Sequence, residues 1–148
     1  MDGQDAPLMP KLRATPAEGR AAATDPGRAT ALALAHGTME LRWFSPSGHD
    51  PQTPHDRDEI YFIVSGTGVF MRAADSAPLD DLAMPLHGME QVPFSPGDAI
   101  FVPAGTEHRF ETFSEDFGCW IVFYGPEGGE AHGHRGHTAA SRGLPALV

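Results

Sequence analysis

The sequence has little of what marks a secreted, membrane-spanning or disulfide-bonded protein. It contains a single cysteine, Cys119, which cannot form a disulfide within the chain. No apolar run approaches the roughly 20 residues that a membrane helix needs, and the first residues lack the basic and apolar segments of a signal peptide. These absences predict a protein of the reducing cytoplasm with no membrane partner.

Positive charge is scarce in the middle of the chain. Residues 31–125 hold fourteen acidic residues against four arginines, so this segment carries the whole formal net charge of −10. Such a surface repels phosphate backbones, and nucleic-acid binding is therefore not expected. The ordinary role of this charge is to keep the surface solvated, and attraction of cations is the alternative.

A helical period of 3.6 residues is also missing from every long stretch. The 17 glycines and 14 prolines among 148 residues instead favour short strands joined by tight turns. The runs 59–64 and 69–72 follow one another across a glycine-containing turn, which predicts a hairpin. About eight short strands indicate an all-β sandwich or barrel, and the expected strands are 29–34, 39–44, 59–64, 69–72, 91–94, 99–102, 108–113 and 119–124.

The length predicts one domain with extensions at both ends. Residues 1–29 hold four prolines and few large apolar side chains, which is typical of a loosely ordered arm or a strap over the surface. Residues 30–125 form the expected barrel, with a long excursion at 73–89, and residues 126–148 are expected to be a flexible tail. That tail contains histidines at metal-like spacing, but a polar tail is the preferred interpretation of His132, His134 and His137.

Two segments combine histidine, glutamate and turn residues at fixed spacings. They resemble the two motifs of the cupin family, G-x5-H-x-H-x3,4-E-x6-G and G-x5-P-x-G-x2-H-x3-N. The first motif departs at Ser47 and Thr53, where the family has glycine and histidine, and the second departs at Thr112, where the family has asparagine. The matching residues are His55, Glu59 and Gly66 in the first motif and Gly97, Pro103, Gly105 and His108 in the second.

This resemblance implies a single-domain jelly-roll barrel that holds a divalent metal. Carried over by position, the metal ligands are His55, Glu59 and His108. Two imidazoles and one carboxylate with open positions suit Fe(II), which is favoured, and Mn, Ni, Co or Zn are alternatives. Because Thr53 is a poor ligand, the fourth position is expected to be filled by water, Gln52 or His49, and a decayed site without metal is the other alternative.

Strand geometry sets a condition on this metal site. Four residues of extended chain, at about 3.3 Å each, separate His55 from Glu59 by roughly 13 Å, too far for one ion. A metal site therefore predicts a bend in the chain at the entry to this strand. Without metal, the two histidines would be hydrogen-bonded residues at a barrel mouth, and Glu59 would face solvent.

Other side chains near the motifs suggest a substrate pocket. We expect Gln52, Tyr61 and Phe110 to line it, and strand parity places Arg57 in phase with His55 as a candidate partner for a substrate carboxylate. By contrast, Cys119 is expected to be a buried structural thiol. Asp56 and Asp58 are expected to be surface charges, and the alternative is that a bend points one of them inward to take the place of a carboxylate ligand.

The resulting hypothesis is a small metal-dependent enzyme acting on a small organic molecule. An Fe(II)-type oxygenase is the favoured reaction class, and the fold also hosts isomerases and lyases. The alternative is a non-catalytic barrel that binds a small molecule or a metal at an incomplete site. A homodimer is expected from the family, and the apolar run 119–124 is compatible with it.

Overall fold

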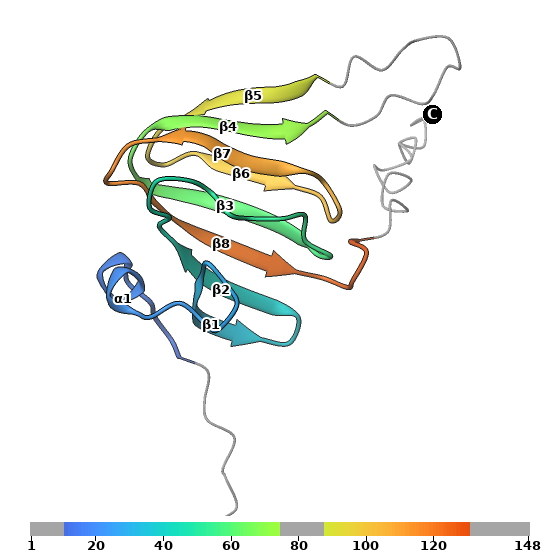
Figure 1. Ribbon diagram of the computed structural model, residues 1–148. Coiled ribbons are helices and arrows are strands. Elements are labelled where there is room, and N and C mark those ends of the chain that lie inside the picture. Colours follow the sequence, from blue (N-terminus) through green and yellow to red (C-terminus); the bar gives the residue numbers. More distant parts are fainter. Residues whose placement is uncertain (1–10, 75–87, 131–148) are drawn as a thin grey trace, which may run out of the picture.

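The computed structural model of the chain describes residues 11–74 and 88–130 (Figure 1). The expected strand runs are all present, with ends shifted by no more than two residues, and a short helix that the sequence did not predict precedes them. No helix in this part of the chain is long and apolar enough to cross a membrane. The elements are α1 (Pro16–Ala21), β1 (Ala31–His36), β2 (Met39–Phe44), β3 (Asp58–Ser65), β4 (Gly68–Ala73), β5 (Met89–Phe94), β6 (Ala99–Val102), β7 (His108–Phe113) and β8 (Gly118–Tyr124).

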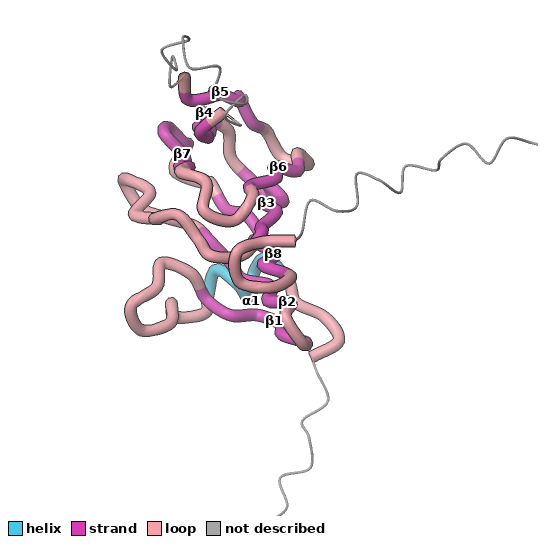
Figure 2. The backbone as a smooth tube through the Cα atoms, turned by 90° about the vertical axis from the view of Figure 1, so that its right-hand side faces the viewer, coloured by secondary structure: helices cyan, strands magenta, loops and turns pink. Residues whose placement is uncertain are grey.

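The strands form two antiparallel sheets, so the predicted all-β class is confirmed. One sheet has the order β1-β2-β8-β3-β6 and the other the order β5-β4-β7. The sheets pack on each other in a jelly-roll-like arrangement whose barrel is not closed by hydrogen bonds between β6 and β7 (Figure 1). In the view turned by 90°, the strands are seen nearly end-on, and long loops project mainly to the left of them (Figure 2).

The predicted hairpin between residues 59–64 and 69–72 is wrong. Strand β3 pairs with β6 and β8, whereas β4 pairs with β5 and β7. The turn between them carries the chain from one sheet to the other. Gly66 has a φ of +85° there, and a Cβ at this position would lie 2.6 Å from the Cα of Phe117, so only glycine fits.

Aromatic side chains fill the space between the sheets. Phe110 lies at the centre of this core, with ring centroids 4.6 Å from Phe117 and 4.9 Å from Phe70. Rings at these distances and tilted angles stabilise one another beyond the area that they bury. The interior of the barrel is therefore packed, and the space for a ligand lies elsewhere. Cys119 is fully buried, as expected of a structural thiol.

The described part of the N-terminal arm lies along the larger sheet as a strap. Pro16 begins helix α1, and the Thr15 side chain caps it by accepting a hydrogen bond from the Glu18 N–H at 3.2 Å. Gly19 packs so closely on Trp43 that a Cβ would lie 2.6 Å from its ring. The expected domain boundaries stay predictions, and most of the 73–89 excursion and of the tail with its three histidines lies outside the described residues.

Candidate metal centre

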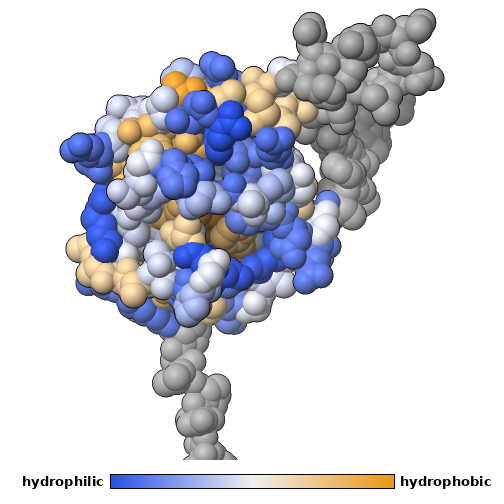
Figure 3. Space-filling view, viewed as in Figure 1, coloured by the Kyte–Doolittle hydropathy of each residue, from blue (hydrophilic) through white to orange (hydrophobic). Residues whose placement is uncertain are grey.

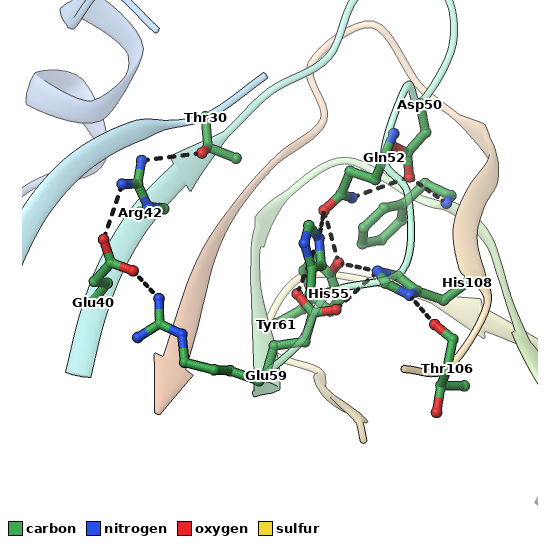
Figure 4. A network of polar contacts seen from close by, with 12 residues as sticks. Thr30, Glu40, Arg42, Asp50, Gln52, His55, Glu59, Tyr61, Thr106 and His108 are labelled. Carbon is green, nitrogen blue, oxygen red and sulfur yellow. Dashed lines mark hydrogen bonds and ion pairs between the residues drawn. The ribbon is translucent and has the colours of Figure 1, made fainter. Parts of the chain in front are cut away.

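Three side chains from separate parts of the sequence converge at one end of the barrel (Figure 4). His55 lies on the loop before β3, Glu59 is the second residue of β3, and His108 begins β7. One ligand atom from each of these three residues lies within 4.8 Å of the others. These are the residues that the motifs single out.

The chain bends before β3, as a metal site requires. Residues 51–57 are not strand, and the backbone bends at positions 56 and 57. The His55 carbonyl accepts a hydrogen bond from the Gly105 N–H at 2.6 Å, which joins this loop to the second motif. The predicted bend is confirmed, and it brings the His55 side chain back toward Glu59.

Asp58 corrects one expectation at this bend. It is 6% exposed rather than a surface charge. Its carboxylate accepts backbone hydrogen bonds from Ala104 and Glu130, both at 2.9 Å. Buried carboxylates need such donors, and these two draw the loop after β6 and the chain after β8 against the start of β3.

Glu59 is the most unusual residue of the site. Its side chain is 1% exposed, and neither carboxylate oxygen has a hydrogen-bond partner within the described chain. Oε1 lies 2.8 Å from the His108 Nε2, and Oε2 lies 3.8 Å from the His55 Nε2. A buried carboxylate without hydrogen bonds is costly unless a cation compensates its charge.

The surroundings of His108 set the role of its ring nitrogens. Its Nδ1 lies 2.8 Å from the Thr106 carbonyl oxygen, which can only accept, so Nδ1 carries the hydrogen and donates. The unprotonated Nε2 faces Glu59 and lies 2.9 Å from the Tyr61 hydroxyl, and a metal bound at Nε2 would replace this contact with Tyr61. Burial lowers the pKa of His108, but the Glu59 carboxylate, the Thr106 carbonyl and Asp50 together raise it by more, so the pKa is raised.

His55 has the opposite shift. Burial lowers the pKa of its half-buried ring, and this effect exceeds the raising effect of Glu59. The neutral imidazole, which is the form that binds metals, is therefore favoured at His55.

Gln52 lies at the place where the motif lacks its first histidine. Its Oε1 lies 3.2 Å from the His55 Nε2 and accepts a hydrogen bond from the Tyr61 hydroxyl at 3.0 Å. Thr53 is exposed, and so is His49. Of the two side chains suggested for the vacant ligand position, the structure brings Gln52 to the site.

Asp50 is a site residue that the sequence reasoning missed. Its carboxylate accepts hydrogen bonds from the Gln52 N–H at 2.9 Å and from the Phe110 N–H at 2.8 Å. It thereby fixes the loop that carries Gln52 to the start of β7. An aspartate two residues before the residue that it bonds is typical of an Asx turn, and this signal is present in Asp50-Pro51-Gln52.

A cavity of about 820 Å³ opens beside the three converging residues. Its walls are residues 24–30 of the strap and residues 51–57 of the loop, and Phe123 lies in its lining. The hollow on the face drawn in Figure 3 has an apolar floor between hydrophilic walls. Of the expected pocket residues, Gln52 lines this cavity, whereas Tyr61 is buried behind the site and Phe110 lies in the aromatic core.

Arg57 also lines the cavity, but its guanidinium is already bound. It donates to the Glu40 carboxylate and, at 2.7 Å, to the Thr38 carbonyl. Arg57 was expected to share a face with His55 by the alternation of side chains along a strand. That expectation is wrong, because residues 55–57 are not extended strand.

The donor set fits a divalent transition metal. Two ligands about 2.1 Å from one ion and at right angles would lie about 3 Å apart. The 2.8 Å from Glu59 Oε1 to His108 matches this spacing, whereas the ligand atoms of the three residues lie up to 4.8 Å apart, so the loop that carries His55 would have to close on an ion. Two imidazoles and a carboxylate leave positions open for other ligands.

Sequence comparisons find distant relatives, although no family model matches the chain. An uncharacterized protein of Streptomyces coelicolor is 40% identical over 78 residues, which are 53% of this chain and 60% of that protein. Two proteins named acireductone dioxygenase, from Parvibaculum lavamentivorans and a Sulfurihydrogenibium species, are 35% and 33% identical over 53% and 60% of this chain. The matched regions span 37% and 44% of those two proteins.

Comparisons with solved structures find cupin proteins. A cupin superfamily protein from Desulfitobacterium hafniense is 16% identical with a TM-score of 0.44, covering 78% of this chain and 93% of that one. A cupin-2 domain containing protein from Shewanella frigidimarina is 14% identical with a TM-score of 0.41, covering 63% and 76%. The two packed antiparallel sheets of this chain, with both motifs meeting at His55, Glu59 and His108, give it a cupin-like jelly-roll fold.

Proposed function

We propose that the chain is a metal-dependent enzyme in which His55, Glu59 and His108 hold one divalent transition metal, with Fe(II) favoured. The observation that carries the proposal is the Glu59 carboxylate, which is buried beside two imidazoles and has no hydrogen-bond partner among the residues that the structure describes. A bound cation would compensate that charge.

The proposed reaction class is oxygenation of a small organic molecule. The similarity to two proteins named acireductone dioxygenase supports dioxygen chemistry. Because the chain matches less than half of each of those proteins, their substrate is not carried over.

Each part of the site has a distinct task in this proposal. When bound, the metal supplies open coordination positions for the substrate and dioxygen, and electrons for the reaction. Thr106 holds the His108 ring by its Nδ1–H, and Asp50 holds the Gln52 loop. Phe123, whose ring centroid lies 5.0 Å from that of His55, places apolar surface beside the site and limits water there.

The test is anaerobic reconstitution of the untagged chain with Fe(II), followed by measurement of iron per chain. We expect about one iron in the parent protein, and none held by the Glu59→Ala or His108→Ala variants. His49→Ala is the matched control, because this histidine is exposed and outside the site. Nitric oxide, which binds Fe(II) as dioxygen does, should then give an electron paramagnetic resonance signal. Equal iron in the parent and both variants would contradict the proposal.

A non-catalytic binding barrel is the second candidate, and one observation favours it. Position 53, where the motif has a histidine, is an exposed threonine. This candidate expects ligand binding that survives a chelator, or bound metal that gives no nitric oxide signal. Either result would replace the enzyme proposal.

A further inference from the structure

The cavity beside the metal centre is lined by one arginine, Arg28, that forms no ion pair with the residues that the structure describes. Four charged residues line this cavity: Asp25, Arg28, Asp56 and Arg57. Asp25 pairs with Arg42 at 2.6 Å, and Arg57 pairs with Glu40. Within residues 11–74 and 88–130, the side chains of Arg28 and Asp56 have no ion-pair partner.

Arg28 is presented by a turn that is fixed at both ends. The Asp25 N–H donates to the Thr30 carbonyl and the Arg28 N–H donates to the Asp25 carbonyl, both at 3.0 Å, and Gly27 at the tip has a φ of +72°. Beneath this turn, the buried Arg42 side chain donates to the side chains of both Asp25 and Thr30. Ordering Arg28 on a ligand would therefore cost little backbone entropy.

The two walls of the cavity share one network of charges, part of which is drawn in Figure 4. Arg42 also donates to Glu40 at 3.0 Å, and Glu40 accepts from Arg57 on the opposite wall. The Arg57 guanidinium lies over the Phe123 ring, 5.7 Å from its centroid. This network pairs four charged residues with one another, Asp25, Arg42, Glu40 and Arg57, and none of its ion pairs includes Arg28.

We infer that this cavity binds a small carboxylate-bearing molecule, with Arg28 on one side of it and the metal centre on the other. The volume of about 820 Å³ lies in the range of small-molecule sites. Arg28 and His55 line the same cavity, so a molecule held there by Arg28 also lies beside the metal centre. A guanidinium binds a carboxylate with two parallel hydrogen bonds.

The inference names the substrate class of the proposed enzyme, but Arg28 can be tested with or without metal. The probe is succinate, compared with its neutral analogue succinamide, titrated calorimetrically into the full chain in both zinc-bound and metal-free form. In the zinc-bound parent we expect succinate to bind at least about tenfold more tightly than succinamide. We expect Arg28→Gln to weaken succinate binding about tenfold and to leave succinamide unaffected.

Two variants serve as controls, and both are exposed residues. Arg13→Gln removes the same charge from the strap outside the cavity and should change the affinity less than about twofold. Asp56→Asn removes a negative charge from the cavity and should not weaken succinate binding. Thermal unfolding curves that match the parent show that Arg28→Gln still folds.

The outcomes separate this inference from the proposed function. Iron or zinc bound by His55, Glu59 and His108, with succinate affinity unchanged in Arg28→Gln, overturns the inference and leaves the metal site standing. No metal uptake, with succinate binding that still depends on Arg28 in the metal-free chain, overturns the enzyme proposal and supports the cavity. Absence of succinate binding in both forms overturns the inference.

Discussion

Glu59 is an ionisable residue in the interior of a small barrel, and the proposed metal-binding role accounts for its position there. Within residues 11–74 and 88–130 its carboxylate has no hydrogen-bond partner, so in the metal-free protein it destabilises the fold when His108 is neutral. The same isolation makes it a strong ligand, because only protonated His108, among the described groups, competes with a cation for it. A residue that lowers stability while completing a site is typical of functional positions.

Glu59→Gln should separate these two effects. Burial lowers the pKa of His108, but Glu59, together with the Thr106 carbonyl and Asp50, raises it by more, so the His108–Glu59 pair stabilises the fold at low pH. That contribution is lost as the pH rises through the raised pKa of His108. At a pH above this raised pKa, where His108 is neutral, we expect metal-free Glu59→Gln to be more stable than the parent by about 1 kcal/mol.

The measurement is urea unfolding of both metal-free proteins at high and at low pH. At about pH 5, where His108 is charged, the advantage of Glu59→Gln should shrink or reverse. His49→Gln controls for a change elsewhere on the surface. A Glu59→Gln protein that is less stable at both pH values would show that the carboxylate is not a cost to the fold.

The residues of the site differ in how far the sequence alone could identify them. His55, Glu59 and His108 were found because motif spacing and the bend that it requires are both readable from the chain. Asp58 was misjudged as a surface charge, because its backbone donors come from Ala104 and Glu130, far away in sequence. Asp50 was missed because its partner Phe110 lies on a different strand.

At the scale of the secondary-structure elements, strands β4 and β7 leave no room for a side chain at Gly68. A Cβ there would lie 2.0 Å from the Thr112 carbonyl oxygen of β7. Gly68→Ala should therefore push β4 and β7 apart, at a cost of about 3 kcal/mol in the free energy of unfolding.

A second glycine provides the control for this substitution. Gly37 has a φ of +58° with nothing within 4 Å of an added Cβ, so Gly37→Ala costs only backbone strain, about 1 kcal/mol. Denaturant unfolding measures both variants. Equal losses would mean that the contact between β4 and β7 does not limit what position 68 accepts.

The strap depends on Arg42 in a similar way. This side chain is 5% exposed and holds Asp25, Thr30 and Glu40 together. Arg42→Leu should destabilise the protein by about 3 kcal/mol, because it leaves Asp25 without its partner and Glu40 with Arg57 alone. Proteolysis or hydrogen exchange within residues 22–30 should increase first. Arg109→Leu, which breaks an exposed pair with Glu111, should cost about 0.5 kcal/mol, and an equal loss would contradict the role given to Arg42.

Local and long-range information account for what the sequence predicted at this scale. The strands were recognisable because alternation and β-branched runs are local properties of the chain. The hairpin prediction was wrong because β3 and β4 pair with strands that are distant in sequence, β8 and β7, and the short turn between β3 and β4 does not determine these pairings. Helix α1 has six residues, too few to show a helical period, and is positioned by the Thr15 cap and by Trp43.

At the scale of the whole molecule, a bound metal should connect the two sheets. His55 and Glu59 belong to the region of β3 in the larger sheet, and His108 belongs to β7 in the smaller one. The strands β6 and β7 are not hydrogen-bonded to each other, so side-chain packing, the hydrogen bond from Arg72 of β4 to the Phe101 carbonyl of β6, and this site join the sheets there. An ion bound by all three residues would act as a cross-link that exists only in the folded state.

Metal binding should therefore stabilise the entire fold. At a free metal concentration of about a thousand times the dissociation constant, the gain is about 4 kcal/mol, which raises the melting temperature of a chain of this size by roughly 10 °C. Calorimetric melting with and without zinc measures this shift. The His55→Ala, His108→Ala double variant should show none of it, because the cation then has one ligand left. A second variant with His132, His134 and His137 changed to alanine should keep the full shift, and a shift that follows those tail residues instead would move the metal out of the barrel.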